Sequence, residues 1–186
     1  MADVEVARLT VPVGPRDHAQ GPADAPVTLV EYGDYECSHC GQAYPIVKEV
    51  QRRLGATLRF VFRNFPLSRT HPHAELAAEA AEGAAAHGKF WEMHDALYEH
   101  QHALDDRHLI AYAEAVGIGR ATFEEELLSH AHKARVREDF MSGVRSGVNG
   151  TPTFFINGVR FDDSWDSDTL TAALKSAMRS AAPQRA

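Results

Sequence analysis

The sequence predicts an α/β fold whose strands are interrupted by an all-helical insertion. The β-branched and apolar runs Val27–Tyr32 and Leu58–Phe62 are typical of buried strands, and a helical pattern from Gly41 to Leu54 joins them. A strand, a helix and a second strand in this order form a βαβ unit with a right-handed crossover. The pattern from Pro66 to Gly147 is then helical throughout, and strands return only after it.

Apolar side chains at three- and four-residue steps mark the buried face of each expected helix. In the first helix, which Gly55 ends, they are Ala43, Ile46, Val47, Val50 and Leu54. The insertion predicts four or five helices with the stripes Phe90, Met93, His94 and Leu97; Phe123 and Leu127; and Val136, Phe140 and Val144. Such stripes indicate packing between helices and not a cofactor site.

The end of the chain predicts a β-hairpin followed by a closing helix. The segments Thr153–Ile156 and Val159–Phe161 flank Asn157–Gly158, two residues that tolerate positive φ and suit the type I′ turn of a two-residue hairpin. A helix over about residues 166–179 follows, with Asp166 or Ser167 as its N-cap.

Length and pattern together divide the chain into predicted parts. The 186 residues suffice for one well-buried core but not comfortably for two domains. The apolar alternation at residues 9, 11 and 13 suggests an edge strand in a proline-rich start. The predicted parts are an N-terminal arm (1–26), a main α/β domain (27–65 and 148–180) and an inserted helical domain (66–147).

The charge balance argues against nucleic acid and membranes as partners. The chain has 19 Lys and Arg against 26 Asp and Glu, and a net charge of -7 repels phosphates and offers no basic anchor for anionic lipids. No stretch approaches the ~20 apolar residues of a membrane-spanning helix. The first eight residues contain acids and lack the basic and apolar regions of a secretory signal, which predicts a cytoplasmic protein.

The two cysteines lie three positions apart, as Cys37-Ser38-His39-Cys40, directly after the first strand. A disulfide between them encloses too few residues to restrict the unfolded chain much, so the pair indicates chemistry and not structural stapling. At a helix N-terminus, Cys37 would meet unpaired backbone N–H groups and the positive end of the helix dipole. We therefore expect Cys37 to be the exposed nucleophile and Cys40, one turn inward, to be the resolving thiol.

His39 lies between the two cysteines and is expected to tune their redox potential. As a cation or a hydrogen-bond donor near sulfur, it would stabilise the Cys37 thiolate and hence the reduced protein. The disulfide would then be a stronger oxidant than in a pair that lacks the histidine.

A zinc half-site is the alternative interpretation, because Cys-x-x-Cys also supplies two ligands of tetrahedral zinc sites. The other ligands could come from the His-x-His pairs His71/His73, His100/His102 and His130/His132. Residues two apart on a helix point in different directions, so these pairs would be poor chelates if they lie on helices. The sequence therefore favours redox chemistry with no metal.

Four ordered stretches of this sequence resemble the DsbA-like branch of the thioredoxin superfamily. They are Asp24–Tyr32 leading to Cys37–Cys40, Phe62–Leu67, Gly88–His94 and Gly150–Gly158. The resemblance spans about residues 18–178 and implies a thioredoxin-like fold with an inserted helical domain. It also implies that Pro152 is a cis proline facing the cysteines and that Thr151 presents its backbone to the substrate chain. We expect Ser38 to contact substrate as well.

The resemblance further implies a buried acid beneath the cysteines, which corresponds to Glu31 here. A carboxylate buried close to Cys40 would have a raised pKa and could take up the proton of the resolving thiol. Asp34 and Glu36 are rival acids for this role.

Two features depart from the family's pattern. Exported members carry a signal peptide, which this sequence does not show, and the segment Asp162–Trp165 lacks the glycine expected there. Both leave the electron partner open.

The sequence thus predicts an enzyme that exchanges disulfides with protein thiols, or with a small disulfide such as a glutathione adduct. It would need no cofactor beyond the Cys37–Cys40 disulfide, and a separate redox partner would recycle it. The alternative is a thioredoxin-like interaction module without turnover, whose cysteines sense redox state or bind metal.

Overall fold

The computed structural model describes residues 6–181, so residues 1–5 of the predicted N-terminal arm lie outside it. The chain divides into two compact units, which we describe separately. The first contains the residues up to Tyr32, Gln42–Arg63 and the residues from Ser142 onward. The second contains Gly33–Gly41 and Asn64–Met141, so it includes the cysteines as well as most of the predicted insertion.

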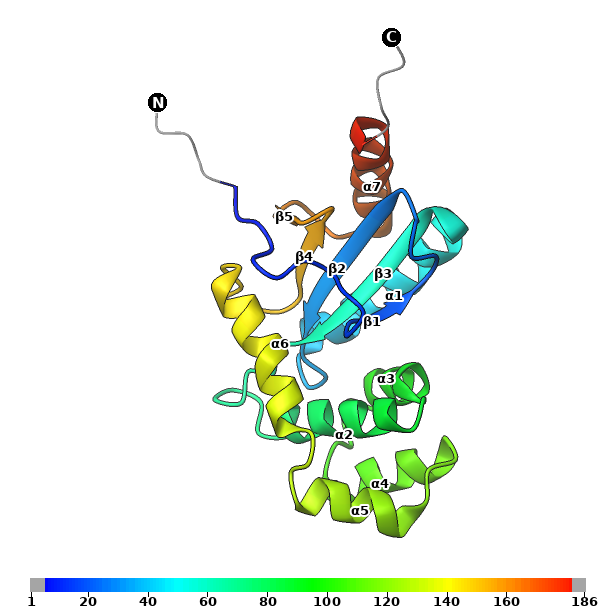
Figure 1. The fold of residues 1–186 in the computed structure, drawn as a ribbon, viewed down its shortest axis with the longest axis vertical. Coiled ribbons are helices and arrows are strands. Elements are labelled where there is room, and N and C mark those ends of the chain that lie inside the picture. Colours follow the sequence, from blue (N-terminus) through cyan, green and yellow to red (C-terminus); the bar gives the residue numbers. More distant parts are fainter. Residues whose placement is uncertain (1–5, 182–186) are drawn as a thin grey trace. The chain divides into compact units, whose positions relative to one another are not determined.

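Within residues 6–181, five strands form one sheet in the order β1-β3-β2-β4-β5 (Figure 1). Their bounds are β1 His18–Gln20, β2 Val27–Gly33, β3 Leu58–Asn64, β4 Thr153–Ile156 and β5 Val159–Phe161. Strand β1 is antiparallel to β3, and β4 is antiparallel to both β2 and β5. The predicted α/β fold and its strands over 27–32, 58–62, 153–156 and 159–161 are confirmed.

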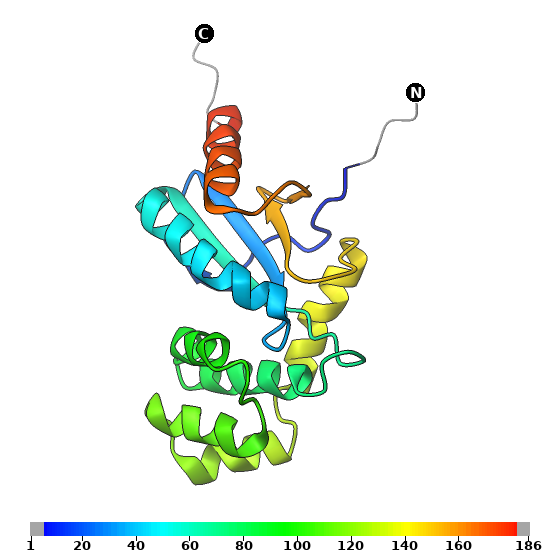
Figure 2. The same ribbon diagram turned by 180° about the vertical axis from the view of Figure 1, so that it is seen from behind.

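Helices α1 (Ser38–Leu54) and α7 (Ser167–Ala181) flank this sheet on the same side, as Figure 2 shows. An ion pair between Arg53 and Asp168, at 2.6 Å, joins the end of α1 to the start of α7. The carboxylate of Asp166 accepts hydrogen bonds from the backbone N–H groups of Asp168 and Thr169, so Asp166 is the N-cap of α7.

The turn between β4 and β5 has the predicted form. Asn157 and Gly158 have φ values of 47° and 79°, the left-handed conformation that a type I′ turn requires at both central residues.

The predicted strand at residues 9–13 of the arm is wrong. Arg8 forms only an isolated bridge with Val159, and the strand of this region is β1. Pro12 has no N–H to donate to a neighbouring strand. The carbonyl groups of Val11 and Pro12 instead accept hydrogen bonds from the Arg63 guanidinium.

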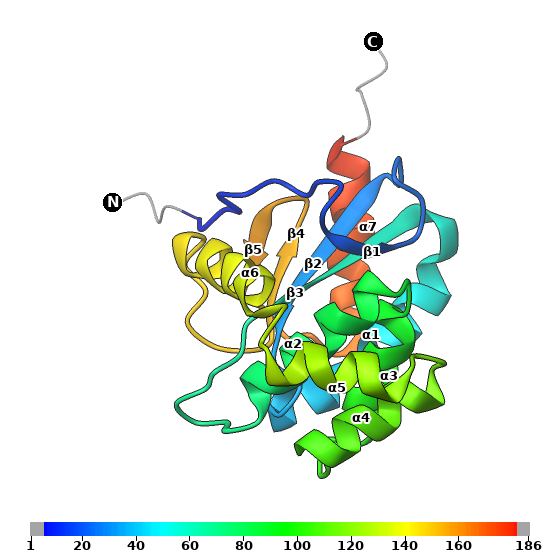
Figure 3. The ribbon, with the colours of Figure 1, turned by 60° about the horizontal axis from the view of Figure 1, so that its bottom comes forward.

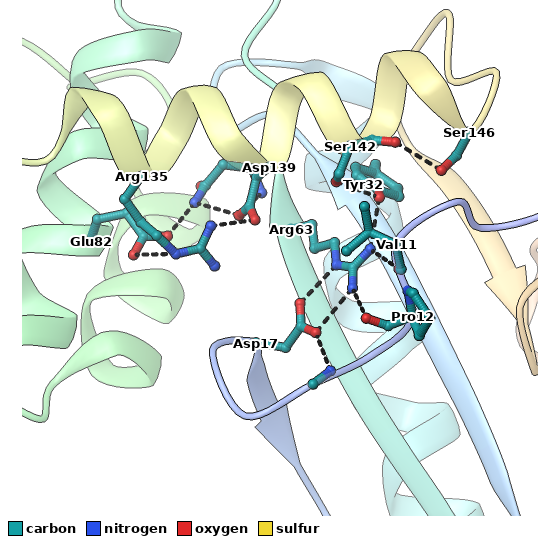
Figure 4. A network of polar contacts seen from close by, with 12 residues as sticks. Val11, Pro12, Asp17, Tyr32, Arg63, Glu82, Arg135, Asp139, Ser142 and Ser146 are labelled. Carbon is teal, nitrogen blue, oxygen red and sulfur yellow. Dashed lines mark hydrogen bonds and ion pairs between the residues drawn. The ribbon is translucent and has the colours of Figure 1, made fainter.

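Arg63 holds the arm to the sheet from within the first unit (Figure 4). Its guanidinium, 2% exposed, pairs with both carboxylate oxygens of Asp17 at 2.7 and 3.0 Å. It also donates to the hydroxyl of Tyr32, which bonds in turn to Ser142. A buried guanidinium needs such partners because an unpaired buried charge is costly.

The second unit contains the helices α2 (Ala74–Ala86), α3 (Phe90–Glu99), α4 (Asp106–Ala115) and α5 (Arg120–Leu128), and the first part of α6 (Lys133–Arg145). Helix α2 packs against α3, α4 and α5, and Figure 3 shows these helices side by side. Within the described residues these are five helices, which agrees with the predicted four or five. The first two apolar stripes of the predicted insertion are buried; their residues are Phe90, Met93, His94, Leu97, Phe123 and Leu127.

The third stripe is only partly buried. Val136 is in the core, Phe140 is half-buried and stacks on Phe65, and Val144, in the last turn of α6, is 46% exposed. The expectation of a fully buried face is therefore wrong for Val144.

The residue after Arg63 anchors the second unit. Asn64 donates a hydrogen bond to Glu82 on α2, and its backbone N–H donates to Asp139 on α6. Arg135 pairs with the same Asp139 carboxylate. Burial raises the pKa of Asp139, against the effect of Arg135. The Phe62–Leu67 stretch thus contains two neighbouring residues with different partners: Arg63 bonds residues of the first unit, and Asn64 bonds residues of the second.

In the part of the chain that the structure describes, no helix is long and apolar enough to cross a membrane.

Candidate active site

Cys37 lies immediately before the first residue of α1, and Cys40 lies in the first turn. The backbone N–H of Gly41 donates to the Cys37 carbonyl at 3.0 Å, which closes that turn. Cys37 therefore occupies the predicted position, next to the N–H groups that a helix leaves without an intrahelical partner. The helix begins at Ser38, three residues before the predicted start.

Both cysteines are buried, with Cys37 5% exposed and Cys40 0% exposed. The expectation that Cys40 is the less accessible thiol is confirmed, but the expectation of an exposed Cys37 is wrong. The physical reason is the anchoring of the preceding residues, Asp34–Cys37, which we call the cysteine loop. Ser38 and His39, between the cysteines, are both exposed.

Tyr35 anchors the cysteine loop to helix α3. Its side chain is buried, and its hydroxyl lies 3.0 Å from Nδ1 of His94. The Tyr35 ring also packs against Tyr98, with the ring centroids 4.9 Å apart. His94 belongs to the Gly88–His94 stretch, so this contact gives that stretch a role at the cysteines.

Gln101, after α3, holds the backbone of the same loop. Its side-chain amide donates to the carbonyl of Tyr35 at 2.7 Å and to that of Cys37 at 3.0 Å. The amide lies where a side chain on Gly41 would be, because an ideal Cβ there would meet the Gln101 Oε1 at 2.0 Å. The glycine after Cys40 thus makes room for this anchor.

Asp34 connects the cysteine loop to the segment between β3 and α2. Its fully buried carboxylate accepts hydrogen bonds from the backbone N–H groups of Glu36 and Leu67, both at 2.8 Å. It also lies 2.7 Å from Nδ1 of His71. The Asp34 carbonyl accepts from the backbone N–H of Cys37 at 3.2 Å.

A second acid–histidine pair lies beside the first. Glu36 accepts from the backbone N–H of His73 at 2.6 Å, and its other carboxylate oxygen lies 2.8 Å from the His73 Nδ1. Asp34 and Glu36, two positions apart, therefore pair with two histidines that are also two positions apart, His71 and His73.

The ring of His71 lies in a negative environment. Burial opposes its protonation, but the hydrogen bond and the charge of Asp34 act against burial, and the net effect raises the pKa of His71. The charges of Cys37 and Glu36 act in the same direction as that of Asp34.

The remaining predicted site residues belong to the first unit. Glu31, 3% exposed, lies in β2 opposite Phe154 of β4. Pro152 follows Thr151 through a cis peptide bond. Because Thr153 pairs with Tyr32, Pro152 lies at the end of β2 from which the chain continues to Cys37. The roles assigned to Glu31, Thr151 and Pro152 stay predictions.

The His-x-His pairs do not lie on helices, so the condition under which they would be poor chelates is not met. All three pairs lie in connections between helices or before one; they are His71/His73 before α2, His100/His102 after α3 and His130/His132 after α5. Among the described residues, no group of three or more His, Cys, Asp or Glu side chains could hold a metal ion.

Sequence reasoning missed the residues that hold the cysteine loop: His71, His94 and Gln101. The sequence did contain a pattern that indicates His71. Asp34 and Glu36 are two positions apart, as are His71 and His73, so the two acids could pair with the two histidines. No comparable pattern marks Gln101.

A family model described as thioredoxin matches residues 14–176. Among solved structures, BdbD from Bacillus subtilis (oxidised) has a TM-score of 0.79 and 25% identity, over 88% of this chain and 93% of that one. A thioredoxin-like oxidoreductase from Silicibacter pomeroyi DSS-3 has a TM-score of 0.78 and 23% identity, over 89% and 94%. The α-DsbA1 of Wolbachia pipientis has a TM-score of 0.78 and 18% identity, over 93% and 96%.

Longer curated relatives also match. The chain is 48% identical over 170 residues to the Na(+)/H(+) antiporter NhaA 1 of Salinispora arenicola, which is 91% of this chain and 26% of that protein. For the Na(+)/H(+) antiporter NhaA of Herminiimonas arsenicoxydans the identity is 43% over 172 residues, or 92% and 27%. The chain spans about a quarter of the length of these relatives. The family match covers most of the chain and the fold, which is similar to that of α-DsbA1, agrees with it: the chain belongs to the thioredoxin family.

Proposed function

We propose that this chain is a thiol–disulfide oxidoreductase that exchanges disulfides with protein thiols through Cys37 and Cys40. The DsbA-type fold supports thiol–disulfide exchange in general. The observation that carries the specific proposal is the position of Cys37 directly before α1, with Cys40 in the first turn. Helix N-termini stabilise thiolates, and the thiolate is the reactive form of cysteine.

In the oxidising direction, a substrate thiolate attacks the Cys37 sulfur of the Cys37–Cys40 disulfide. The bond between the two protein sulfurs breaks, and Cys40 leaves as a thiolate that takes up a proton. A second substrate thiolate then attacks the substrate sulfur of the mixed disulfide, and Cys37 leaves as a thiolate. Two electrons pass from the substrate thiols to the protein, so the disulfide itself is the electron carrier.

The order of attack follows from access. Cys37 is the more exposed of the two thiols, and Cys40 is fully buried. Exposed Ser38 and His39 would border the entering substrate. Oxidised glutathione or an unidentified redox protein would restore the disulfide.

The test is trapping by single-cysteine variants. Cys40→Ser exposed to an oxidised model peptide should form a mixed disulfide through Cys37, seen by mass spectrometry. The matched variant Cys37→Ser should trap nothing, and only the wild type should turn over in an insulin disulfide assay.

Other results would contradict the proposed function. Equal trapping by both variants, or zinc retained stoichiometrically by the purified wild type, would support the metal-binding interaction module instead. Two ligands of one metal would behave alike on substitution.

A further inference from the structure

We propose that His71 is a further functional residue of this redox site: held by the buried Asp34 carboxylate, its imidazolium favours the thiolate form of Cys37 and hence the reduced protein. The inference rests on the proposed function of the cysteines and names the residue that balances charge around the nucleophile. His71 does not take part in bond exchange. It is a positioning residue that acts on Cys37 through its charge.

The first step is that Asp34 has a fixed position. Its side chain is 0% exposed, and both carboxylate oxygens accept hydrogen bonds: Oδ1 from the backbone N–H of Glu36, and Oδ2 from that of Leu67. These donors come from two separate segments of the chain. A carboxylate held in this way cannot turn away from either segment.

The second step is that His71 has a fixed position relative to Asp34. Its Nδ1 lies 2.7 Å from Oδ2, and its side chain is 21% exposed. Its backbone N–H donates to the Leu67 carbonyl at 2.9 Å, so the same short turn positions both partners of the carboxylate.

The third step links this pair to the nucleophile. The carbonyl of Asp34 accepts from the backbone N–H of Cys37, and the Asp34 side chain accepts from the backbone N–H of Glu36, the residue before Cys37. Asp34 therefore fixes the backbone that leads into Cys37 as well as the ring of His71. As a thiolate, Cys37 acts together with Asp34 and Glu36 to raise the pKa of His71.

Such a coupling is reciprocal. If a Cys37 thiolate favours protonation of His71, protonated His71 must favour the Cys37 thiolate by the same free energy. The charge is needed here because Asp34 and Glu36 are two acids of the loop that leads into Cys37, and like charges disfavour a thiolate. His71 offsets the anion that holds it.

The neighbouring pair provides a matched control. His73 and Glu36 form the same kind of contact at 2.8 Å, but the His73 side chain is 47% exposed and that of Glu36 is 20% exposed. Solvent screens an exposed pair more strongly. We therefore expect His73 to contribute much less to the Cys37 thiolate.

The experiment titrates the Cys37 thiolate by its absorbance at 240 nm in a Cys40→Ser background. His71→Asn keeps a hydrogen-bond donor for Asp34 but removes the charge, and it should raise the Cys37 pKa. A shift of one unit would lower the thiolate-to-thiol ratio roughly tenfold at a fixed pH below both values. His73→Asn should change the ratio by less than about twofold.

The potential gives a second measurement in the protein with both cysteines. His71→Asn should shift the equilibrium with glutathione toward more reducing values by a similar factor, while His71→Arg, which keeps a cation beside Asp34, should restore most of it. If His71→Asn does not fold, His71→Gln makes the same neutral substitution.

Two results would overturn the inference: a Cys37 titration unchanged by loss of the His71 charge, or an equal change in His73→Asn. Both are distinguishable from failure of the proposed function. In that case the wild type would not exchange with glutathione or trap peptides, whereas the thiolate titration requires no turnover.

Discussion

The contact between Gly41 and Gln101 leads to a prediction about stability. The effect of Gly41→Ala on the free energy of unfolding should change sign when the Gln101 side chain is removed. An alanine Cβ at position 41 would lie 2.0 Å from Oε1 and 2.7 Å from Cδ of Gln101. Atoms cannot approach so closely, and the amide is the end of a flexible side chain. We expect Gly41→Ala to displace the amide and leave α1 in place.

The displaced amide would lose its hydrogen bonds to the carbonyls of Tyr35 and Cys37. At a net 0.5–1.5 kcal/mol for each bond, the loss is about 1–3 kcal/mol of stability. Alanine is better than glycine in a helix by about 1 kcal/mol, which offsets part of it. Gly41→Ala should therefore destabilise the wild type by about 0–2 kcal/mol.

In a Gln101→Ala background the same substitution meets no amide. It should then stabilise the protein by up to about 1 kcal/mol, the helix propensity alone. Urea unfolding of the four proteins of this cycle measures the coupling energy, expected at about 1–3 kcal/mol. An effect of Gly41→Ala with the same sign and size in both backgrounds would refute the reasoning.

Further predictions concern the arm, the potential and the pH dependence of stability. Arg63→Ala should cost about 3–5 kcal/mol in urea unfolding because it leaves a buried carboxylate without its cation, and Arg63→Lys should recover only part of this. His39→Ser should raise the Cys37 pKa and make the couple more reducing in a glutathione titration, where 30 mV corresponds to about 1.4 kcal/mol; an unchanged glutathione equilibrium would show that His39 is a bystander. The raised pKa of His71, for which Asp34 outweighs burial, contributes stability that is fully present below the ordinary histidine value of about 6.5 and is lost as pH rises through the folded-state value. The difference in unfolding free energy between wild type and His71→Asn should therefore shrink between pH 5 and pH 9, and a constant difference would contradict the assignment.

The elements that could be predicted are those whose information is local. The strands and most helix faces follow from periodicity, and the β4–β5 turn follows from the φ preferences of Asn157 and Gly158. The start of α1 could not be placed in this way, because Ser38-His39-Cys40 has no apolar periodicity to show that it is helical.

The candidate site was also predicted only in part, because only its local features can be read from the sequence. The positions of Cys37 and Cys40 follow from the sequence between a strand and a helix, which is local information. The burial of Cys37 does not, since it depends on residues such as His94 and Gln101 that are more than fifty positions away and pack against the cysteine loop. The failed prediction at residues 9–13 also has a non-local cause. The Arg63 guanidinium donates to the carbonyl groups of Val11 and Pro12, and these hydrogen bonds set the path of the arm.

These anchors assign a role to the helical part of the second unit. The cysteine loop is held by Gln101 through its backbone carbonyls, by His94 through Tyr35, and by His71 through Asp34. Each anchor comes from the chain between β3 and α4, and none of these contacts is made by the sheet. Substitutions of these anchoring residues can therefore change the position and charge environment of Cys37 without touching its sulfur. In the proposed function, helix α3 and the segments before α2 and after α3 thus contribute to the redox site, because they fix the backbone on which a thiolate at a helix N-terminus depends.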